Sequence, residues 1–265
     1  MKELKIVTFN IRTLYDEHDG VNSFIHRAGL ILDKISEEKP HIICFQEVSE
    51  RIRQFLNKYL TDYILVGHGR HENYDGEGLS VAILKESIEL FGLEHFWLSP
   101  TPFLPASRYE NQSQYPRICQ RLILKHIDSS MPVRIYNVHL DHISDEARIL
   151  GIRQILEKIS AENKDFVCPT IIMGDFNAVP DSKTISYCRE YKEFPIFELT
   201  EKLGETFHDF GGTGTAKNAR GTHIDYMFAD LKMTQKLTEI YKWTDAKNGI
   251  YLSDHYPICA KFCID

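Results

Sequence analysis

Short runs of apolar residues recur along the whole chain, and their length constrains the fold more than any other feature. Most are rich in β-branched or aromatic residues and end at polar or turn-forming residues, as β-strands do. Some are apolar almost throughout, which indicates strands covered on both faces, and others alternate, which indicates one polar or functional face. The predicted strands span residues 4–11, 41–45, 63–67, 79–84, 118–126, 133–140, 170–173, 224–228 and 258–264.

Four segments between these strands carry the spacing of amphipathic helices. They are marked by Phe24, Ala28, Ile31 and Ile35, by Ile52, Phe55, Leu56 and Tyr59, by Ile149, Ile152, Leu156 and Ile159, and by residues 182–191. Pro40 ends the first helix, and Ser144 caps the third, whose first turn is acidic. No repeat or linker interrupts this alternation. The sequence therefore predicts one mixed α/β domain over residues 1–265.

Two segments are predicted to be irregular. Residues 96–116 contain Pro100, Pro102, Pro105 and Pro116, too many for regular structure. Loops of this length are often functional, although a plain surface loop fits equally well. The glycine-rich residues 211–217 lack the strand–loop–helix context of a phosphate-binding loop, so we expect a loop at the rim of the site.

Composition narrows the class of protein. The net charge of -7 lowers the expectation of a protein that grips nucleic acid non-specifically, because such proteins carry a basic surface. The six cysteines form no C-x-x-C pair and show no zinc-like spacing. No run approaches the roughly 20 apolar residues that cross a bilayer, and no apolar secretory segment precedes the first strand. We expect a cytoplasmic protein without a membrane anchor.

Polar side chains recur at the ends of the predicted strands. The set comprises Asn10, Glu47, His139, Asp141, Asp175, Asn177, Asp225, Asp254 and His255. A single acid or amide at a strand end commonly caps a turn. This many in one chain indicate a shared site, because strand ends in α/β sheets deliver side chains into one crevice.

The donor types in this set favour magnesium. Asn10, Glu47 and Asp254 offer oxygen ligands, and no set of cysteines and histidines is present to recruit zinc. Hard oxygen donors suit Mg²⁺, which binds few carboxylates and keeps waters for a substrate phosphate, with Mn²⁺ as a substitute. Asp175 is placed to orient an attacking water and Asn177 to donate to a phosphate oxygen.

Two histidine–acid couples are predicted. His255 is a candidate donor or cation for the phosphoryl group, with Asp225 as the acid that raises its pKa and fixes its tautomer. His139 is a candidate general acid for the leaving oxygen, with Glu77 as its partner.

The motifs around these residues resemble the endonuclease/exonuclease/phosphatase superfamily, which includes deoxyribonuclease I and exonuclease III. The matching segments are Thr8-Phe9-Asn10-Ile11, Phe45-Gln46-Glu47, Asn137-Val138-His139-Leu140-Asp141, Gly174-Asp175-Phe176-Asn177, His223-Ile224-Asp225 and Ser253-Asp254-His255-Tyr256-Pro257. They follow the family's order and span nearly the whole chain. Residues 96–102 and 139–142, with Ala147-Arg148, further resemble small bacterial-type members whose substrates are undefined.

The resemblance implies a deoxyribonuclease I-like, four-layer sandwich of two packed mixed β-sheets flanked by helices. It implies Glu47 as the main metal ligand with Asn10 near it, and Asp175 and Asn177 as the residues that handle water and phosphate. It also implies that Asp225 orients His255. His139 is similar to the second catalytic histidine of the deoxyribonuclease I branch.

We therefore expect a metal-dependent phosphoesterase that hydrolyses a phosphodiester or phosphomonoester by in-line attack of water on a small phosphorylated substrate. A nuclease acting on DNA or RNA is one alternative, and a catalytically inactive binding module of the same fold is another. Arg12 and Arg117 are candidate substrate contacts, since guanidinium binds phosphate in bidentate fashion, although surface salt bridges are an equally consistent interpretation. No protein partner is inferred.

Overall fold

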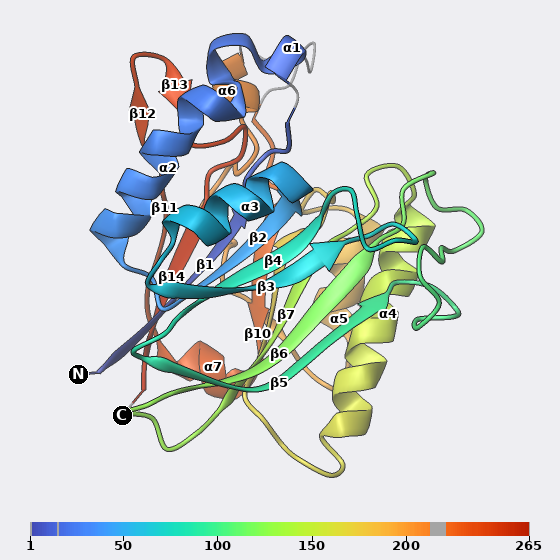
Figure 1. Cartoon of the computed structure of the whole chain (residues 1–265). Helices are drawn as coiled ribbons and strands as arrows, with labels where there is room; N and C mark the ends of the chain where they lie inside the picture. The colour runs from blue at the N-terminus through green and yellow to red at the C-terminus, as the bar shows by residue number, and fades with distance from the viewer. Residues whose placement is uncertain (1, 15, 213–220, 265) are drawn as a thin grey trace.

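Two six-stranded sheets organise the computed structural model, which describes residues 2–14, 16–212 and 221–264 (Figure 1). The first sheet has the order β11-β14-β1-β2-β4-β3 and contains β1 (Glu3–Asn10), β2 (Ile42–Val48), β3 (Tyr63–Gly69), β4 (Gly78–Leu84), β11 (Leu237–Lys242) and β14 (Ile258–Cys263). The second has the order β5-β6-β7-β8-β10-β9 and contains β5 (Ile88–Trp97), β6 (Ile118–His126), β7 (Val133–His139), β8 (Thr170–Asp175), β9 (Phe197–Glu198) and β10 (Asp225–Ala229). In each sheet one pair is parallel, β1 with β2 and β7 with β8. A short hairpin joins β12 (Ala246–Lys247) and β13 (Ile250–Tyr251).

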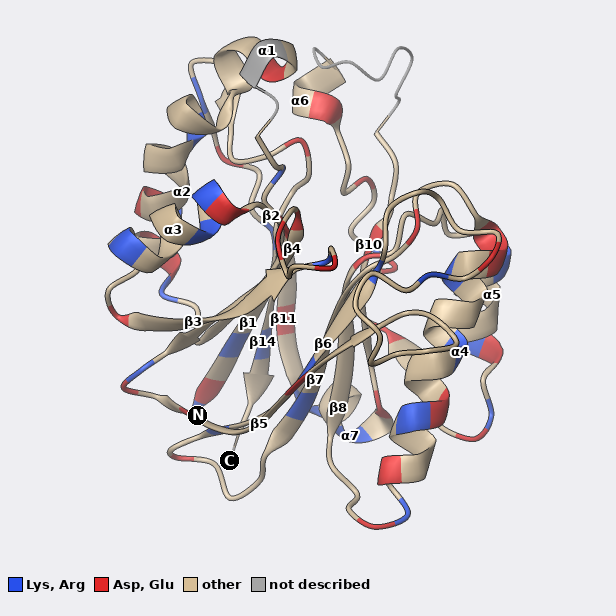
Figure 2. Cartoon of the chain, turned by 45° about the vertical axis from the view of Figure 1, so that its right-hand side comes forward, with Lys and Arg blue, Asp and Glu red and all other residues tan. Residues whose placement is uncertain are grey.

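Helices cover the outer faces of both sheets. The covering helices are α2 (Phe24–Glu38), α3 (Glu50–Tyr59), α4 (Asp145–Glu162) and α5 (Lys183–Glu190). The described chain also contains α1 (Asp16–Asp19), α6 (Asp209–Gly212), a 3-10 turn at Gly20–Asn22 and α7 (Leu231–Lys236), whose Met233 packs in the core between the sheets. Figure 2 shows α2 and α3 outside the first sheet and α4 and α5 outside the second. This four-layer sandwich of two mixed sheets confirms the predicted fold class.

The two-residue period of the strands sorts their side chains between three apolar layers. In β1, Leu4 and Ile6 face the other sheet, whereas Val7 and Phe9 pack beneath α2 and α3. In β8, Ile171 and Met173 face inward while Ile172 packs beneath α4 and α5, and the other central strands follow the same rule. Polar residues on the inward positions therefore face the opposite sheet.

The predicted helix ends are confirmed. The Ser144 hydroxyl accepts a hydrogen bond from Ala147 N (3.2 Å) at the start of α4. Lys39 adopts a left-handed conformation (φ 44°) at the end of α2, directly before Pro40.

The edge strands β5 and β11 were not predicted. Both lie at sheet edges, and charged, polar or glycine residues interrupt their apolar residues, so neither forms a long apolar run. Phe96 and Trp97 complete β5, which corrects the expectation that the irregular segment begins at residue 96.

Residues 98–117 contain no helix or strand, and hydrogen bonds tie them to α4. Gln154 accepts from Ser99 N (3.1 Å) and from the Tyr109 hydroxyl (2.9 Å), and Asn111 donates to Glu146. The segment is therefore anchored beside the second sheet. Most of the glycine-rich segment predicted as a rim loop, residues 213–217, lies outside the described residues.

None of the helices in the described part of the chain has both the length and the apolar content that a bilayer-spanning segment requires.

Candidate active site

Three acidic or imidazole side chains stand in a row across the inner face of the second sheet. His139 at the end of β7 pairs in register with Asp175 of β8, and Asp175 pairs with Asp225 of β10. Strand alternation turns all three toward the other sheet. His139 comes two residues after Asn137, Asp175 two residues after Met173, and Asp225 two residues before Met227, and these three reference residues face inward. Neighbouring strands thus deliver them to one edge of the sandwich.

The first sheet contributes Asn10 and Glu47 by two different routes. Asn10 follows the inward positions of β1, so alternation alone directs it to the site. Glu47 follows Phe45, whose side chain packs under the helices, and a regular strand would turn Glu47 the same way. The pairing of β2 with β4 shifts register between Phe45 and Val48, and Glu47 adopts φ 61° there. This bulge re-aims Glu47 toward the site.

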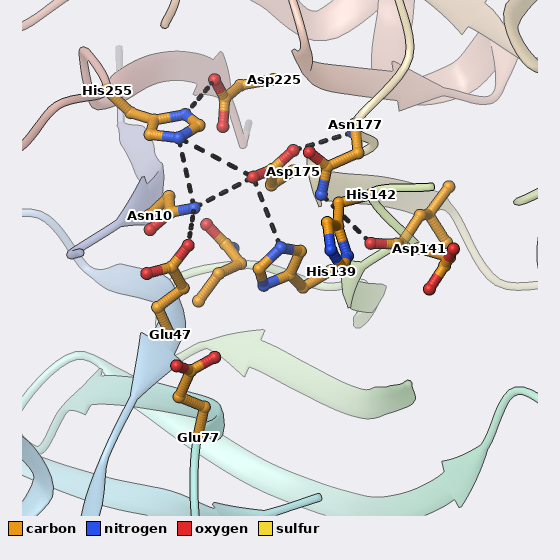
Figure 3. Close-up of polar contacts among 12 residues, drawn as sticks. Asn10, Glu47, Glu77, His139, Asp141, His142, Asp175, Asn177, Asp225 and His255 are labelled. Atoms are coloured by element: carbon orange, nitrogen blue, oxygen red, sulfur yellow. Dashed lines mark hydrogen bonds and ion pairs between the residues drawn. The ribbon is translucent and has the colours of Figure 1, made fainter. Parts of the chain in front are cut away.

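Asn10 joins the two halves of the site (Figure 3). Its Nδ2 donates to Glu47 Oε1 (3.1 Å) and to Asp175 Oδ2 (2.9 Å), and it lies 3.4 Å from His255 Nε2. Its Oδ1 accepts from Arg12 N (3.0 Å). Both ends of this buried amide are therefore fixed, and the amide fixes the spacing of the two carboxylates.

His255 and Asp225 form the predicted couple. His255 Nδ1 lies 2.8 Å from Asp225 Oδ2, and the ring of Phe207 packs against the imidazole at 4.9 Å between centroids. The Thr206 hydroxyl accepts from the backbone N–H groups of Ile224 and Asp225 and so holds the start of β10. The His255 Nε2 edge is left facing Asp175 Oδ2 at 3.8 Å.

The segment 174–177 bends sharply so that Asp175 and Asn177 both line the cleft while Phe176 is buried under α4 and α5. Gly174 has φ 140°, and a Cβ at this position would lie 1.9 Å from Val138 O of the neighbouring strand. Asn177 has φ 49°, its N–H donates to Asp175 Oδ1 (2.8 Å), and its Nδ2 donates to Leu140 O (3.1 Å). One carboxylate oxygen of Asp175 is thereby held by the turn, and the other faces Asn10 and the histidines.

The buried charges shift one another's pKa values. Burial and the neighbouring Asp225 carboxylate raise the pKa of Asp175 to about 7. Burial would lower the pKa of His255, but Asp225 outweighs it and raises that pKa to about 10. Burial lowers the pKa of His139 well below its ordinary value, and Arg117 and Arg70 act in the same direction. Burial would raise the pKa of Glu47, but Arg12 and the Thr13 N–H hold it below its ordinary value.

The donor atoms of Glu47, His139 and Asp175 all lie within 4.8 Å of one another. Two carboxylates in such a cluster fit a hard divalent cation that binds through few protein ligands. Asn10 directs its NH₂ group, and not its oxygen, at Glu47 and Asp175. Asp254 lines the cleft beside Arg12. It accepts from the Ser253 hydroxyl (3.0 Å) and lies 3.4 Å from Arg12 Nη1. The metal-ligand roles of Asn10 and Asp254 stay predictions.

These residues line a cleft of about 350 Å³. Its lining comprises Arg12, Glu47, Arg70, Glu77, Tyr115, Arg117, His139, His142, Asp175, Asn177, Phe207, Thr222, Ile224, Asp254 and His255. The structure thus brings together nine of the eleven predicted site residues in the lining of one cleft, and the other two, Asn10 and Asp225, are hydrogen-bonding partners of lining side chains.

The predicted couple between Glu77 and His139 does not form. Glu77 Oε2 accepts from Arg70 Nη2 at 2.7 Å, and the acid beside His139 Nε2 is Asp175 at 3.5 Å. The two side chains come from separate sheets, and Figure 3 shows Glu77 outside the network that contains His139. Arg70 and Glu77 face each other across the hairpin that joins β3 and β4, so the arginine balances the charge of this acid.

The two predicted substrate arginines differ in their surroundings. Arg12 contacts Asp19 (3.1 Å) and Asp254 (3.4 Å), so its charge is balanced by acids of the cleft wall. Arg117 is 4% exposed, and its Nη2 donates to Nδ1 of His142 at 2.9 Å. His142 is thus engaged by a cation.

Several residues that shape the site are not among the predicted site residues, although two of them, Gln46 and Asn137, lie within the matching motifs. Gln46 Nε2 donates to Asn137 Oδ1 (2.7 Å), and Asn137 Nδ2 donates to Phe45 O (3.1 Å), which bridges the two sheets beneath the site. Arg27 of α2 is fully buried and donates to the carbonyls of Ile11 and Leu252 (both 2.8 Å). Inward strand alternation would have found Gln46 and Asn137, whereas Arg27 resembles any charged residue on a helix.

The comparisons with known proteins agree with this geometry. The chain is similar in structure, over 100% of both chains, to an endonuclease/exonuclease/phosphatase from Bacteroides vulgatus (TM-score 0.88, 24% identity). A mannosyl-6-phosphatase from Bacteroides thetaiotaomicron superposes over 97% of this chain and 98% of its own (TM-score 0.83, 22% identity). TDP2 from D. rerio, complexed with a single-strand DNA product, superposes over 99% and 100% (TM-score 0.75, 17% identity). Residues 7–255 match the Endonuclease/Exonuclease/phosphatase family in sequence, and the chain belongs to this family.

Proposed function

We propose that this protein is a Mg²⁺-dependent phosphoesterase that hydrolyses a small phosphorylated substrate. The observation that carries the proposal is the meeting of Glu47, His139 and Asp175 within 4.8 Å, directly beside the His255–Asp225 couple. Family membership supports a hydrolase of the phosphoesterase or nuclease type. The cation and the substrate are our inference from the site.

Glu47 and Asp175 would hold the cation, which when bound would withdraw charge from the phosphoryl oxygens. Asp175 is also positioned to accept a proton from the attacking water. The water oxygen forms a bond to phosphorus as the bond to the leaving oxygen breaks, so that one phosphate and one alcohol are released. His139, whose Nε2 lies 3.5 Å from Asp175 Oδ2, is placed to hydrogen-bond to the leaving oxygen, which takes its proton from bulk water because the lowered pKa of His139 keeps the imidazole neutral.

His255 and Asn177 are proposed to bind the phosphoryl group. His255 presents Nε2 to the cleft because Asp225 holds Nδ1, so its charge is directed at an incoming anion. Asn177 uses one N–H of its amide on Leu140 O and keeps the other for a phosphate oxygen. Asp225 acts through His255 and is a positioning residue.

The size and charge of the site favour a small substrate. A cleft of about 350 Å³ accommodates a molecule near the lower end of the range for small-molecule sites. The chain has a net charge of -7, which disfavours non-specific association with long nucleic acids. A nuclease is the second candidate, because Tyr115 and Phe207 line the cleft and offer faces on which bases stack.

A matched substrate panel tests this proposal. Purified protein with Mg²⁺ should release phosphate from sugar phosphates faster than it cleaves single-stranded or duplex oligonucleotides, and Asp175→Asn should abolish both reactions. Preferred cleavage of oligonucleotides would replace the proposed substrate by nucleic acid. No metal-dependent hydrolysis across the panel by correctly folded protein would favour the inactive binding module. The predicted cytoplasmic location stays a prediction.

A further inference from the structure

One wall of the cleft is cationic and borders His139. We call it the arginine wall: Arg70 and Glu77 from the loop before β4, Tyr115 and Arg117 from the segment before β6, and His142 after β7. We propose that Arg117 and Arg70 form a second oxyanion subsite, which binds a phosphate group of the substrate other than the one that is hydrolysed. This inference deepens the proposed function, because it assumes that the scissile phosphate lies over Glu47, Asp175 and His255.

Arg117 is a buried cation with unused donors. Its side chain is nearly inaccessible, and only its Nη2 is hydrogen-bonded, to His142 Nδ1 at 2.9 Å. Its Nε and Nη1 have no hydrogen-bond partner within the described structure. Buried polar groups are almost always paired, and an unpaired buried charge is strongly unfavourable, so this guanidinium calls for a ligand.

The acid nearest to Arg117 does not satisfy it. Asp141 Oδ2 lies 3.8 Å from Arg117 Nε, beyond hydrogen-bond distance. Asp141 already accepts from Ser113 N and Oγ and from the backbone N–H groups of Ile143 and Ser144. Its oxygens are occupied by neutral donors, so it moderates the charge of Arg117 without using the guanidinium's free N–H groups.

Arg70 supplies the second guanidinium. Its Nη2 donates to Glu77 (2.7 Å), its Nε has no hydrogen-bond partner in the described chain, and its guanidinium carbon lies 4.9 Å from the centroid of the Tyr115 ring. The Arg70 carbonyl accepts from Trp97 Nε1 (2.8 Å), which anchors the loop. The contact with Tyr115 and the hydrogen bond from Trp97 thus hold the Arg70 guanidinium in place.

The two guanidiniums are close enough to repel each other. Burial and the charge of Arg70 together lower the pKa of Arg117 to about 10. Both groups line one cleft of about 350 Å³ with the reacting residues. An oxyanion between them would pair the free donors and cancel the repulsion, and guanidinium binds phosphate oxygens in bidentate fashion.

Arg12 is not part of this subsite. It lies on the Glu47 side of the cleft, where Asp19 and Asp254 already balance its charge. The second phosphate could belong to a small bisphosphorylated molecule or to the neighbouring phosphodiester of a nucleic-acid strand. The chemistry recognised is the same, and competition experiments separate the two sources.

The test measures anion binding without turnover. Inorganic phosphate is titrated calorimetrically into metal-free protein in EDTA, using Glu47→Gln as the background so that the proposed catalytic cation site is disabled. Arg117→Gln and Arg70→Gln in this background should each weaken phosphate binding by about 10-fold or more, the effect of losing a charge-assisted hydrogen bond. Arg121→Gln is the matched control, because Arg121 lies in β6, four residues after Arg117, and pairs with Glu162 outside the cleft. Arg117→Lys should retain part of the affinity.

Competition by fructose 1,6-bisphosphate and by a short oligothymidylate then identifies the source of the anion. A larger loss of affinity for the bisphosphate in Arg117→Gln assigns the subsite to a small bisphosphorylated substrate, and a larger loss for the oligothymidylate assigns it to a strand. The proposal is overturned if phosphate fails to bind at millimolar concentrations, or binds equally to the parent, Arg117→Gln and Arg70→Gln proteins with native melting profiles. If phosphate binds and depends on Arg117 and Arg70 but the wild-type protein hydrolyses no substrate, the proposed function is contradicted and the subsite is retained.

Discussion

At the residue scale, the site depends on side chains that hold other side chains. Asp225 contacts His255 at 2.8 Å and lies behind the cleft lining, and Asn10 spaces Glu47 from Asp175. Neither residue needs to touch a substrate to govern the reaction. Their roles are therefore best tested by measurements that separate binding from turnover.

Asp225→Asn should lower kcat by roughly 100-fold or more while KM changes little, because an amide does not hold the imidazole in its charged, oriented form. The pKa of His255, followed by NMR in metal-free protein, should be about 10 in the wild type and fall toward its ordinary value in the variant. Glu239→Gln, at an exposed carboxylate paired with Lys261, is the control. An unchanged His255 titration in Asp225→Asn would contradict the assigned role.

At the element scale, strand alternation explains most of the site. Once the strands are placed, the period of two sends Asn10, His139, Asp175 and Asp225 to the inner faces. Glu47 breaks this rule, because the bulge in β2 arises from pairing with β4, which lies more than thirty residues away in sequence. The Phe45-Gln46-Glu47 motif identifies Glu47 as a site residue, but only the register shift explains why its side chain points into the site.

Gly174→Ala should destabilise the protein by about 2 kcal/mol or more, because the added Cβ meets Val138 O of β7 and φ 140° disfavours a side chain. Gly29→Ala is the matched control, since that Cβ meets nothing within 4 Å in the middle of α2. It should leave stability unchanged or raise it by about 0.5–1 kcal/mol. Equal denaturant midpoints for both variants would refute this account of the turn.

The fold was more predictable from the sequence than the contacts within the site. Apolar runs predict the central strands, whereas β5 and β11 are not predicted because charged, polar or glycine residues interrupt their apolar residues. Glu77 pairs with Arg70 because the two residues face each other across the hairpin between β3 and β4, where Arg70 N also donates to Glu77 O (3.0 Å). The hairpin register predicts this pair only once β3 and β4 are aligned, and His139 belongs to the other sheet.

At the scale of the whole molecule, the sandwich presents different chemistry at its two ends. At the end that holds the site, Figure 2 shows acidic and basic segments near β2, β4 and β10. At the other end, the rings of His41 and His126 meet between the sheets at 5.0 Å. His41 Nδ1 accepts from Lys5 N (2.9 Å), which requires a neutral imidazole.

Stability should decrease as pH falls from about 6.5 to 4. Burial, followed by His126 and Lys5, lowers the pKa of His41 to about 4, below its value of 6.5 in the unfolded chain. The unfolded state therefore binds more protons within this window, and the stabilisation is lost as pH falls through it. His41→Asn keeps an acceptor for Lys5 N without a titrating ring, so its urea midpoint should fall less over the same range. An identical pH dependence in both proteins would show that His41 does not contribute.

The central claim is that this cleft hydrolyses phosphate esters with a divalent cation held at Glu47. The most direct measurement is the hydrolysis of p-nitrophenyl phosphate and bis-p-nitrophenyl phosphate by EDTA-treated protein as Mg²⁺ is added back, for wild type and Glu47→Gln. The account predicts saturable, Mg²⁺-dependent turnover in the wild type and a loss of roughly 100-fold or more in the variant. Turnover that persists in EDTA, or that Glu47→Gln retains at the same Mg²⁺ concentration with a native fold, would contradict it.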